Sequence, residues 1–260
     1  MKFDIGKAAE AAIRLARAAG EIQRAKYETN VKVELKGSIN LVTEVDVECE
    51  RLITAALRGE FPEHNVVAEE GTDTSTGSGY TWYVDPLDGT TNYAHGVPVF
   101  GPSIALVKDG EPLAGAVYDP MRDEMFSAVK GEGAYLNGKR MKVSATARLE
   151  GAVLATGFPY EIKTLKANNM ENFNRVAPQC RAIRRCGAAA IDLAWTARGR
   201  FDGFWEQYLY AWDMAAGALM VTEAGGVITD MKGNKLDLLG KHICAATPGI
   251  HANLLKLLEC

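Results

Sequence analysis

Hydrophobic and polar positions follow a helical period at the start of the chain. From residue 4 to residue 27, apolar side chains recur every three or four positions, which predicts a helix with one buried face. The same spacing predicts a second helix over residues 43–61. Thr43 and Asp46 stand three positions apart at its start, which is typical of a reciprocal helix cap.

The middle third of the chain changes to short β-prone runs separated by Gly or Asp. These runs are bounded by turn-forming residues, so each predicts a strand. Lys-Asp-Gly-Glu at residues 108–111 joins two of the runs and is typical of a hairpin turn. The predicted strands cover residues 80–85, 103–108, 115–119, 125–130 and 133–136.

Helical patterns return in the last third of the chain. They cover residues 165–180, 188–198 and 213–223, and a final apolar stretch over residues 250–258 predicts a terminal helix. Gly225, followed by a second glycine, ends the third of these patterns as a helix stop.

The order of the elements predicts the fold class and the number of domains. Helices come first, then a β-rich centre, then mixed elements, which predicts an α+β protein built of layered sheets and helices. No repeat, low-complexity segment or long linker divides the chain, so we expect a single domain over residues 1–260. The small polar stretch of residues 71–79 predicts a surface loop and not a domain joint.

Composition and charge exclude several classes of protein. The chain has 260 residues, of which 47% are hydrophobic and 24% charged, so general disorder is excluded. The formal net charge of −4 argues against a nucleic-acid partner bound through a basic surface. No stretch reaches the ~18 apolar residues of a membrane span, and no export signal is expected. The five cysteines are scattered without a Cys-x-x-Cys pair, which favours a reducing cytoplasm and neither zinc nor thioredoxin-like chemistry.

The segment Asp85-Pro-Leu-Asp88-Gly-Thr-Thr-Asn92 carries the most chemical information. Its turn brings two carboxylates toward one point, and like charges about 4 Å apart repel by roughly 4 kcal/mol at an effective dielectric of about 20. A divalent cation between Asp85 and Asp88 removes this cost, and oxygen-only ligands favour Mg²⁺ over a transition metal. On spacing alone a plain surface turn explains these residues equally well, because Asp, Pro and Gly are the commonest turn formers.

Other residues near this segment have both a functional and a structural interpretation. The backbone amides of Gly89 and Thr90 are unhindered and, at a helix start, would bind phosphate. Glu69 follows a β-prone run and is either a further cation ligand or a solvated loop edge. Asp213 is either a rigid ligand or only a helix N-cap. Glu206 either pairs with a substrate hydroxyl or lies on the surface.

Four blocks together resemble the inositol monophosphatase family of Mg²⁺-dependent, lithium-sensitive phosphatases. The blocks occur in the family's order and span most of the chain. They are Leu41-Val-Thr-Glu-Val-Asp46, Glu69-Glu-Gly71, Asp85 through Asn92, and Trp212-Asp-Met-Ala-Ala-Gly217 through Gly226. The resemblance implies a five-layered αβαβα sandwich and a homodimer.

The resemblance also implies a role for each matching residue. Thr90 and Asp46 match the hydroxyl and the carboxylate at the nucleophilic water, and Glu69 completes the catalytic set. Lys36 lies in the segment that matches the family's mobile metal-site loop. The implied ligands of two or three Mg²⁺ ions are Glu69, Asp85, Asp88, Asp213 and the backbone carbonyl of Leu87. The implied contacts to phosphate and substrate are Asp88, Gly89, Thr90, Ala189, Glu206 and Asp213.

The sequence therefore predicts a cytoplasmic Mg²⁺-dependent hydrolase of phosphate monoesters. A small polyol or sugar phosphate is the expected partner, with inositol 1-phosphate first. Fructose 1,6-bisphosphate is the alternative, because Gly157-Phe-Pro-Tyr160 is similar to a segment of bacterial and archaeal members that accept both. A second alternative, from another class, is a regulatory binding protein that uses the same scaffold, for instance in transcription complexes.

Overall fold

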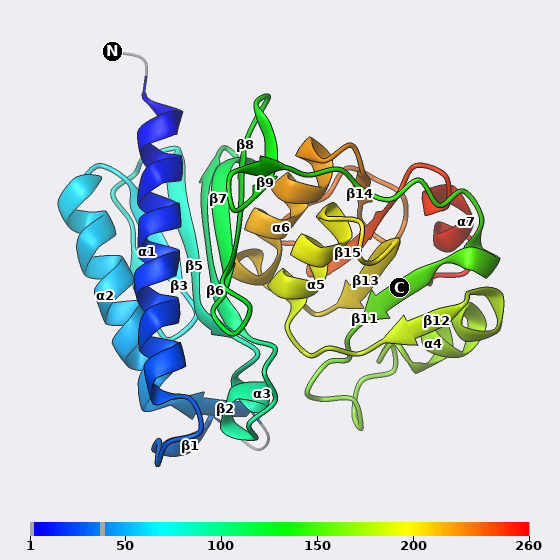
Figure 1. The fold of residues 1–260 in the computed structure, drawn as a ribbon, viewed down its shortest axis with the longest axis horizontal. Helices are drawn as coiled ribbons and strands as arrows, with labels where there is room; N and C mark the ends of the chain where they lie inside the picture. The colour runs from blue at the N-terminus through cyan, green and yellow to red at the C-terminus, as the bar shows by residue number, and fades with distance from the viewer. Residues whose placement is uncertain (1–2, 37–39, 260) are drawn as a thin grey trace.

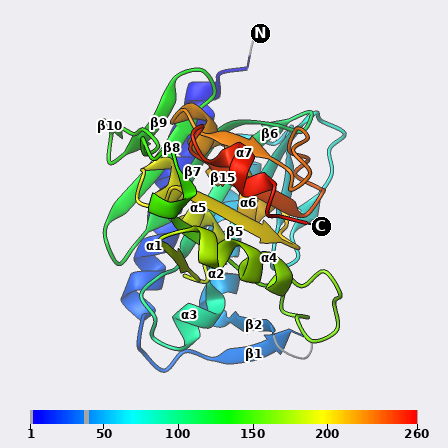
Figure 2. The ribbon, with the colours of Figure 1, turned by 90° about the vertical axis from the view of Figure 1, so that its right-hand side faces the viewer.

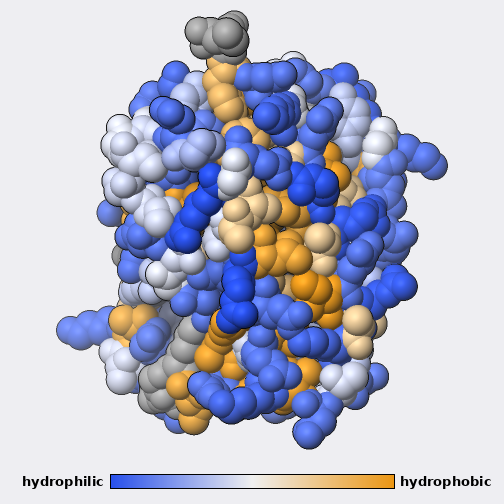
Figure 3. Space-filling model, turned by 90° about the vertical axis from the view of Figure 1, so that its left-hand side faces the viewer, coloured by the Kyte–Doolittle hydropathy of each residue, from blue (hydrophilic) through white to orange (hydrophobic). Residues whose placement is uncertain are grey.

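The computed structural model describes residues 3–36 and 40–259. Its first layer consists of the two predicted N-terminal helices, α1 (Ile5–Lys26) and α2 (Glu44–Glu60), which lie beside each other (Figure 1). The predicted cap of α2 is confirmed, because Asp46 accepts the backbone N–H of Thr43 at 2.9 Å and Thr43 Oγ1 accepts the N–H of Asp46 in return. The outward face of this layer is mostly hydrophilic, with apolar side chains gathered along part of it (Figure 3).

The second layer is a largely antiparallel sheet with the order β10-β9-β8-β7-β6-β5-β3-β4, in which only β3 and β5 pair in parallel. The hairpin predicted at residues 108–111 is confirmed, since Asp109 and Gly110 both have positive φ between β6 and β7. The strands are β3 (Asn65–Ala68), β4 (Asp73–Thr74), β5 (Tyr80–Asp88), β6 (Gly101–Lys108), β7 (Glu111–Asp119), β8 (Glu124–Val129), β9 (Gly133–Leu136) and β10 (Lys139–Arg140).

The third layer is a helix pair, α5 (Ala189–Ala197) and α6 (Ala211–Glu223), which separates the first sheet from a second one (Figure 1). The second sheet has the order β12-β11-β13-β15-β14 and is mixed, because β11 runs parallel to both of its neighbours. Its strands are β11 (Val153–Thr156), β12 (Ala182–Arg184), β13 (Gly203–Gln207), β14 (Val227–Thr229) and β15 (His242–Ala246).

Two short helices, α4 (Met170–Val176) and α7 (His251–Leu255), cover the outer face of the second sheet (Figure 2). The layers therefore alternate as helix, sheet, helix, sheet, helix, which is the αβαβα sandwich that the resemblance implies. Outside this stack lie the hairpin of β1 (Val33–Lys36) and β2 (Asn40–Thr43), the short helix α3 (Thr90–Ala94), and 3₁₀ turns at Leu149–Gly151 and Ala177–Gln179.

Three hydrophobic clusters fill the interfaces between the layers. Leu15 of α1 and Ile53 of α2 pack with Trp82 and other side chains of the first sheet. A second cluster fills the space around α5 and α6, and a third lies between the second sheet and the helices α4 and α7. Burial of these apolar faces is the main force that stacks the layers.

Several predicted elements differ from the structure. The helix predicted over residues 165–180 is reduced to α4, because Asn169 takes a left-handed conformation (φ 70°) that stops a helix from starting earlier. The loop predicted over residues 71–79 contains the edge strand β4. The terminal helix is shorter than residues 250–258. Within residues 3–36 and 40–259, no helix is long and apolar enough to cross a membrane.

Candidate active site

Asp85 and Asp88 lie at the end of β5, which continues three residues beyond its predicted end. The pairing of β5 with β6 shifts register between these two aspartates, so the strand bulges there and turns both side chains inward. A hydrogen bond from α1 stabilises the bulge, because the buried side chain of Gln23 donates to the Pro86 carbonyl at 2.7 Å. Asp85 Oδ1 accepts the backbone N–H of Leu87 at 2.9 Å.

Asp88 connects the β5 turn to the start of α5. Its Oδ2 accepts the backbone N–H of Ala190 at 2.7 Å, and Ala189 is the first residue of that helix. Burial raises the pKa of Asp88 to about 7, although the amides of α5 and the charge of Arg185 oppose this rise. The contact places Ala189 directly beside the carboxylate pair.

Asp213 lies one turn inside α6, where its Oδ2 accepts the backbone N–H of Tyr210 at 2.7 Å. The interpretation of Asp213 as an N-cap is therefore wrong, because Tyr210 occupies that position and α6 begins two residues before the predicted start. Burial, and then the charges of Glu69 and Asp88, raise the pKa of Asp213 well above its usual value.

Thr90 and Asp46 form a hydrogen-bonded pair behind the β5 turn. Thr90 Oγ1 lies 2.9 Å from Asp46 Oδ1 and 3.1 Å from the Leu87 carbonyl oxygen. Asp46 is fully buried at the start of α2, and this burial raises its pKa. The capping box thus fixes the carboxylate that orients the Thr90 hydroxyl.

One cavity of about 490 Å³ collects the predicted site residues. Asp46 is the exception, because it lies behind Thr90 and does not reach the cavity wall. The side chain of Lys36 lies outside the part of the chain that the structure describes. The predicted residues that line the cavity are Glu69, Asp85, Leu87, Asp88, Gly89, Thr90, Ala189, Glu206 and Asp213.

The donor set of this cavity fits a hard cation. Burial and the charges of Glu69, Asp88 and Asp213 raise the pKa of Asp85 well above its usual value, so the ionised carboxylates repel one another without a cation. Each aspartate gives one oxygen to a backbone amide, so a second oxygen remains for a ligand bond. Among the described residues, no three His, Cys, Asp or Glu side chains already surround one point as a complete ligand group.

Glu206 of β13 lines the opposite wall of the cavity. Burial, and then the charge of Asp192, raise its pKa to about 8. Gly157 faces this carboxyl group so closely that any side chain at position 157 would collide with it. The surface interpretation of Glu206 is therefore wrong, and Gly157 is a residue whose importance the sequence did not reveal.

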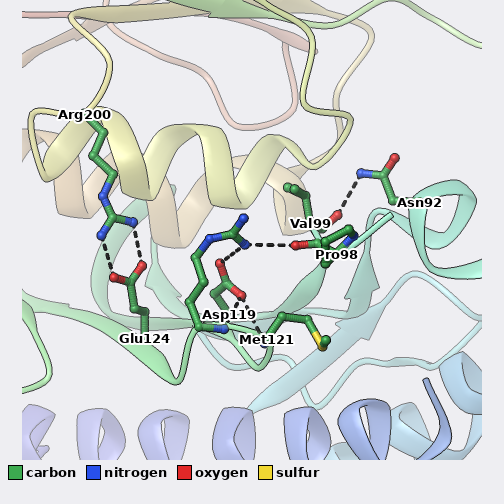
Figure 4. A network of polar contacts seen from close by, with 8 residues as sticks. Asn92, Pro98, Val99, Asp119, Met121, Glu124 and Arg200 are labelled. Atoms are coloured by element: carbon green, nitrogen blue, oxygen red, sulfur yellow. Dashed lines mark hydrogen bonds and ion pairs between the residues drawn. The ribbon is translucent and has the colours of Figure 1, made fainter. Parts of the chain in front are cut away.

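Asn92 links the turn after β5 to two other segments, a role that its place at the end of a motif does not reveal. Its Nδ2 donates to the carbonyl oxygens of Val99 at 2.7 Å and Cys186 at 2.8 Å. Figure 4 shows the Val99 bond beside Pro98. The Pro98 carbonyl accepts a hydrogen bond from Arg122 at 2.9 Å, and Arg122 also donates to the buried carboxylate of Asp119. Hydrogen bonds from Asn92 and Arg122 thus fix residues 98–99, between α3 and β6.

Comparisons with known proteins agree with the predicted family. The family model described as "Inositol monophosphatase family" matches residues 4–260. A Nus factor SuhB of Pseudomonas aeruginosa is 44% identical, over 95% of this chain and 94% of the relative. An inositol-1-monophosphatase of Caulobacter vibrioides is 40% identical, over 98% of this chain and 99% of the relative.

Solved structures give the same result. The inositol monophosphatase of Anabaena (Nostoc) superposes with a TM-score of 0.90 at 36% identity, covering 98% of this chain and 96% of the other. The extragenic suppressor protein suhB of Bartonella henselae also gives a TM-score of 0.90, at 40% identity over 96% of this chain and 97% of the other. The predicted resemblance and the α+β fold are confirmed, and the chain belongs to the inositol monophosphatase family.

Proposed function

We propose that this protein is a Mg²⁺-dependent hydrolase of phosphate monoesters that acts as one catalytic domain. Family membership supports a phosphatase. The observation that carries the proposal is the convergence of Glu69, Asp85, Asp88 and Asp213 in one cavity, beside the hydrogen-bonded pair of Thr90 and Asp46. An acidic cavity repels a phosphate ester unless cations neutralise it, so the carboxylates and the substrate class together call for a metal.

The metal ligands divide between two positions in this proposal. Glu69, Asp85 and the Leu87 carbonyl would hold one Mg²⁺ ion, and Asp85, Asp88 and Asp213 a second. When bound, Mg²⁺ lowers the pKa of water and neutralises charge on the leaving oxygen. The number of ions, two or three, stays a prediction.

Thr90 and Asp46 would prepare the attacking water. Thr90 donates a hydrogen bond from its hydroxyl to Asp46 Oδ1. The lone pairs of Thr90 Oγ1 then point away from Asp46 and can accept a hydrogen bond from the attacking water. Gly89 is the N-cap of α3 with φ 91°, and its N–H and that of Thr90 would bind phosphate oxygens. Phosphoryl transfer needs chiefly such positioning and charge stabilisation, without a covalent intermediate.

Ala189 and Glu206 would select the alcohol part of the substrate. Glu206 donates a hydrogen bond to a substrate hydroxyl when it is protonated and accepts one when it is ionised. With a pKa of about 8, both forms of its carboxyl group are available near neutral pH. This arrangement favours a polyol, with inositol 1-phosphate first and fructose 1,6-bisphosphate as the alternative. The 40% identical relative named inositol-1-monophosphatase supports that order. Lithium sensitivity, a homodimer and a cytoplasmic location stay predictions.

A regulatory binding protein on the same scaffold is the second candidate. Several relatives at 40–44% identity are named Nus factor SuhB, which is not the name of an enzyme. Every carboxylate of the proposed metal site is nevertheless present in the cavity. For this reason we place hydrolysis first, and the absence of a nucleic-acid partner stays a prediction.

A phosphate-release panel tests the proposal. Purified protein is assayed with inositol 1-phosphate, fructose 1,6-bisphosphate and adenosine 3′,5′-bisphosphate while Mg²⁺ and Li⁺ are titrated. We expect Mg²⁺-dependent release that is fastest with inositol 1-phosphate. Release from none of these esters at any Mg²⁺ concentration would contradict the hydrolase and favour the binding protein.

A further inference from the structure

The loop between β11 and α4 forms one wall of the cavity, and the proposed mechanism gives it no role. Gly157–Glu161 and Leu165 of this loop line the same cavity as the carboxylates. In Figure 1 the loop reaches the lower edge of the molecule, where α3 also lies. The loop therefore faces the phosphate-binding turn from a separate part of the chain.

The base of this loop is fixed by a buried asparagine. Asn169 donates from Nδ2 to the Gly157 carbonyl at 2.6 Å, and its Oδ1 accepts the Trp205 indole N–H at 2.8 Å. The two ends of the loop are thereby tied to each other and to β13. Farther along, Leu165 N–H donates to the Glu161 carbonyl at 3.1 Å. Such a loop presents its side chains in a defined place.

Tyr160 is the polar side chain that this loop brings to the phosphate-binding turn. It lines the same cavity as Asp88, Gly89 and Thr90. The charges of Glu69, Asp88 and Asp85 all act on its hydroxyl. Tyr160 is 44% exposed, so a ligand that enters the cavity can reach it.

We propose that Tyr160 contacts the substrate by donating a hydrogen bond from its hydroxyl to a phosphate oxygen, because it lines the cavity together with Asp88, Gly89 and Thr90. This inference rests on the proposed function of the same cavity. A phosphate oxygen carries negative charge and is a strong acceptor, so such a bond is favourable. The phenol remains a neutral donor beside the carboxylates, and it brings no further charge to the site.

The expected effect is on binding more than on turnover. The phosphate oxygens outside the breaking bond carry negative charge in both the substrate and the transition state, so the Tyr160 bond stabilises both alike. Loss of one hydrogen bond to a charged group weakens binding roughly 10-fold. Tyr160→Phe should therefore raise KM about 10-fold while kcat stays within about 2-fold.

Two measurements on the full chain test this contact. The first is the dissociation constant of inorganic phosphate in the presence of Mg²⁺, by calorimetry, which needs no turnover. The second is kcat and KM for inositol 1-phosphate. The matched control is Tyr135→Phe, since Tyr135 donates to the Glu132 carbonyl at 2.9 Å on the surface of β9, away from the cavity.

If Tyr160 contacts phosphate, Tyr160→Phe should bind phosphate more weakly and have a higher KM, whereas Tyr135→Phe should match the wild type. The melting temperature should be unchanged in both variants. Equal phosphate affinity in wild type and Tyr160→Phe would overturn the contact, even if the protein proves to be an active phosphatase. If the wild type hydrolyses no ester but binds phosphate more tightly than Tyr160→Phe, the contact stands and the hydrolase proposal fails. A fall in kcat at unchanged KM would also contradict a binding contact.

Discussion

At the scale of single residues, the aspartates of the cavity are subject to opposing forces. Backbone amides stabilise the ionised forms of Asp85, Asp88 and Asp213, whereas burial and mutual repulsion favour the protonated forms. Surface carboxylates face no such conflict. A bound cation removes the repulsion without taking the amides away, which explains how a stable fold can hold these groups so close together.

Replacement of Asp88 by asparagine should separate catalysis from folding. Asparagine has nearly the same shape but no charge, so we expect kcat to fall roughly 100- to 1,000-fold through the loss of a cation ligand. The melting temperature in Mg²⁺-free buffer should not fall, because a buried charge has been removed. Asp109→Asn, on the exposed β6–β7 turn, is the control and should retain full activity. A near-normal kcat in Asp88→Asn would refute the assignment.

Glu206 should make stability depend on pH. Its pKa rises from 4.5 to about 8 in the folded chain, so its contribution to stability is complete below pH 4.5 and is lost as the pH rises toward 8. Glu206→Gln should remove this part of the decline. Urea unfolding at a series of pH values between 4.5 and 8 measures the difference between variant and wild type. Parallel curves for the two proteins would show that Glu206 is ionised in the folded state.

At the scale of elements, Asn92 joins three segments that meet at the phosphate-binding turn. It lies in α3, and its two hydrogen bonds reach Val99, just before β6, and Cys186, just before α5. The Asp88 bond to Ala190 adds a second link between the turn and α5. The elements are therefore aligned by polar contacts in addition to apolar packing.

Asn92→Ala should loosen this alignment. Loss of two partly buried hydrogen bonds is expected to lower the free energy of unfolding by about 2 kcal/mol. A small shift of α5 relative to Asp88 should lower kcat about 10-fold. Denaturant unfolding and steady-state kinetics measure these effects, and Asn253→Ala on the exposed side of α7 is the control. An unchanged unfolding free energy would show that the two bonds do not align the turn.

At the scale of the whole molecule, the cavity depends on the stacking of layers. It draws Glu69 from the turn after β3, Asp85 from β5 of the first sheet, Asp213 from the middle helix layer and Glu206 from the second sheet. A ligand that bridges these elements binds the folded state and not the unfolded chain. Binding should therefore be coupled to global stability.

Magnesium should stabilise the whole protein. At a concentration 100 times its dissociation constant, the expected gain in the free energy of unfolding is about 2.7 kcal/mol, and EDTA should reverse it. The gain should be much smaller in Asp85→Asn, which removes a ligand of both proposed ions. Thermal unfolding with and without Mg²⁺ measures the effect. Equal stabilisation of wild type and variant would place the cation elsewhere.

The sequence predicted the elements whose signals are local. Helical spacing and the Thr43–Asp46 cap defined α2 to within a residue, because both depend on neighbours three or four positions apart. It failed at residues 165–169, where a helical pattern competes with the buried hydrogen bonds of Asn169. Those bonds join residues that are distant in sequence, and no local pattern contains them.

The same division holds for the site. Motif order alone identified Asp85, Asp88, Asp213 and Glu69, because each block keeps its chemistry within a few consecutive residues. The tertiary structure alone decided that half-buried Glu206 lies against Gly157, and that the loop of Tyr160 lines the same cavity as Gly89 and Thr90. These facts depend on how layers pack, and packing is set by long-range burial that a linear pattern does not encode.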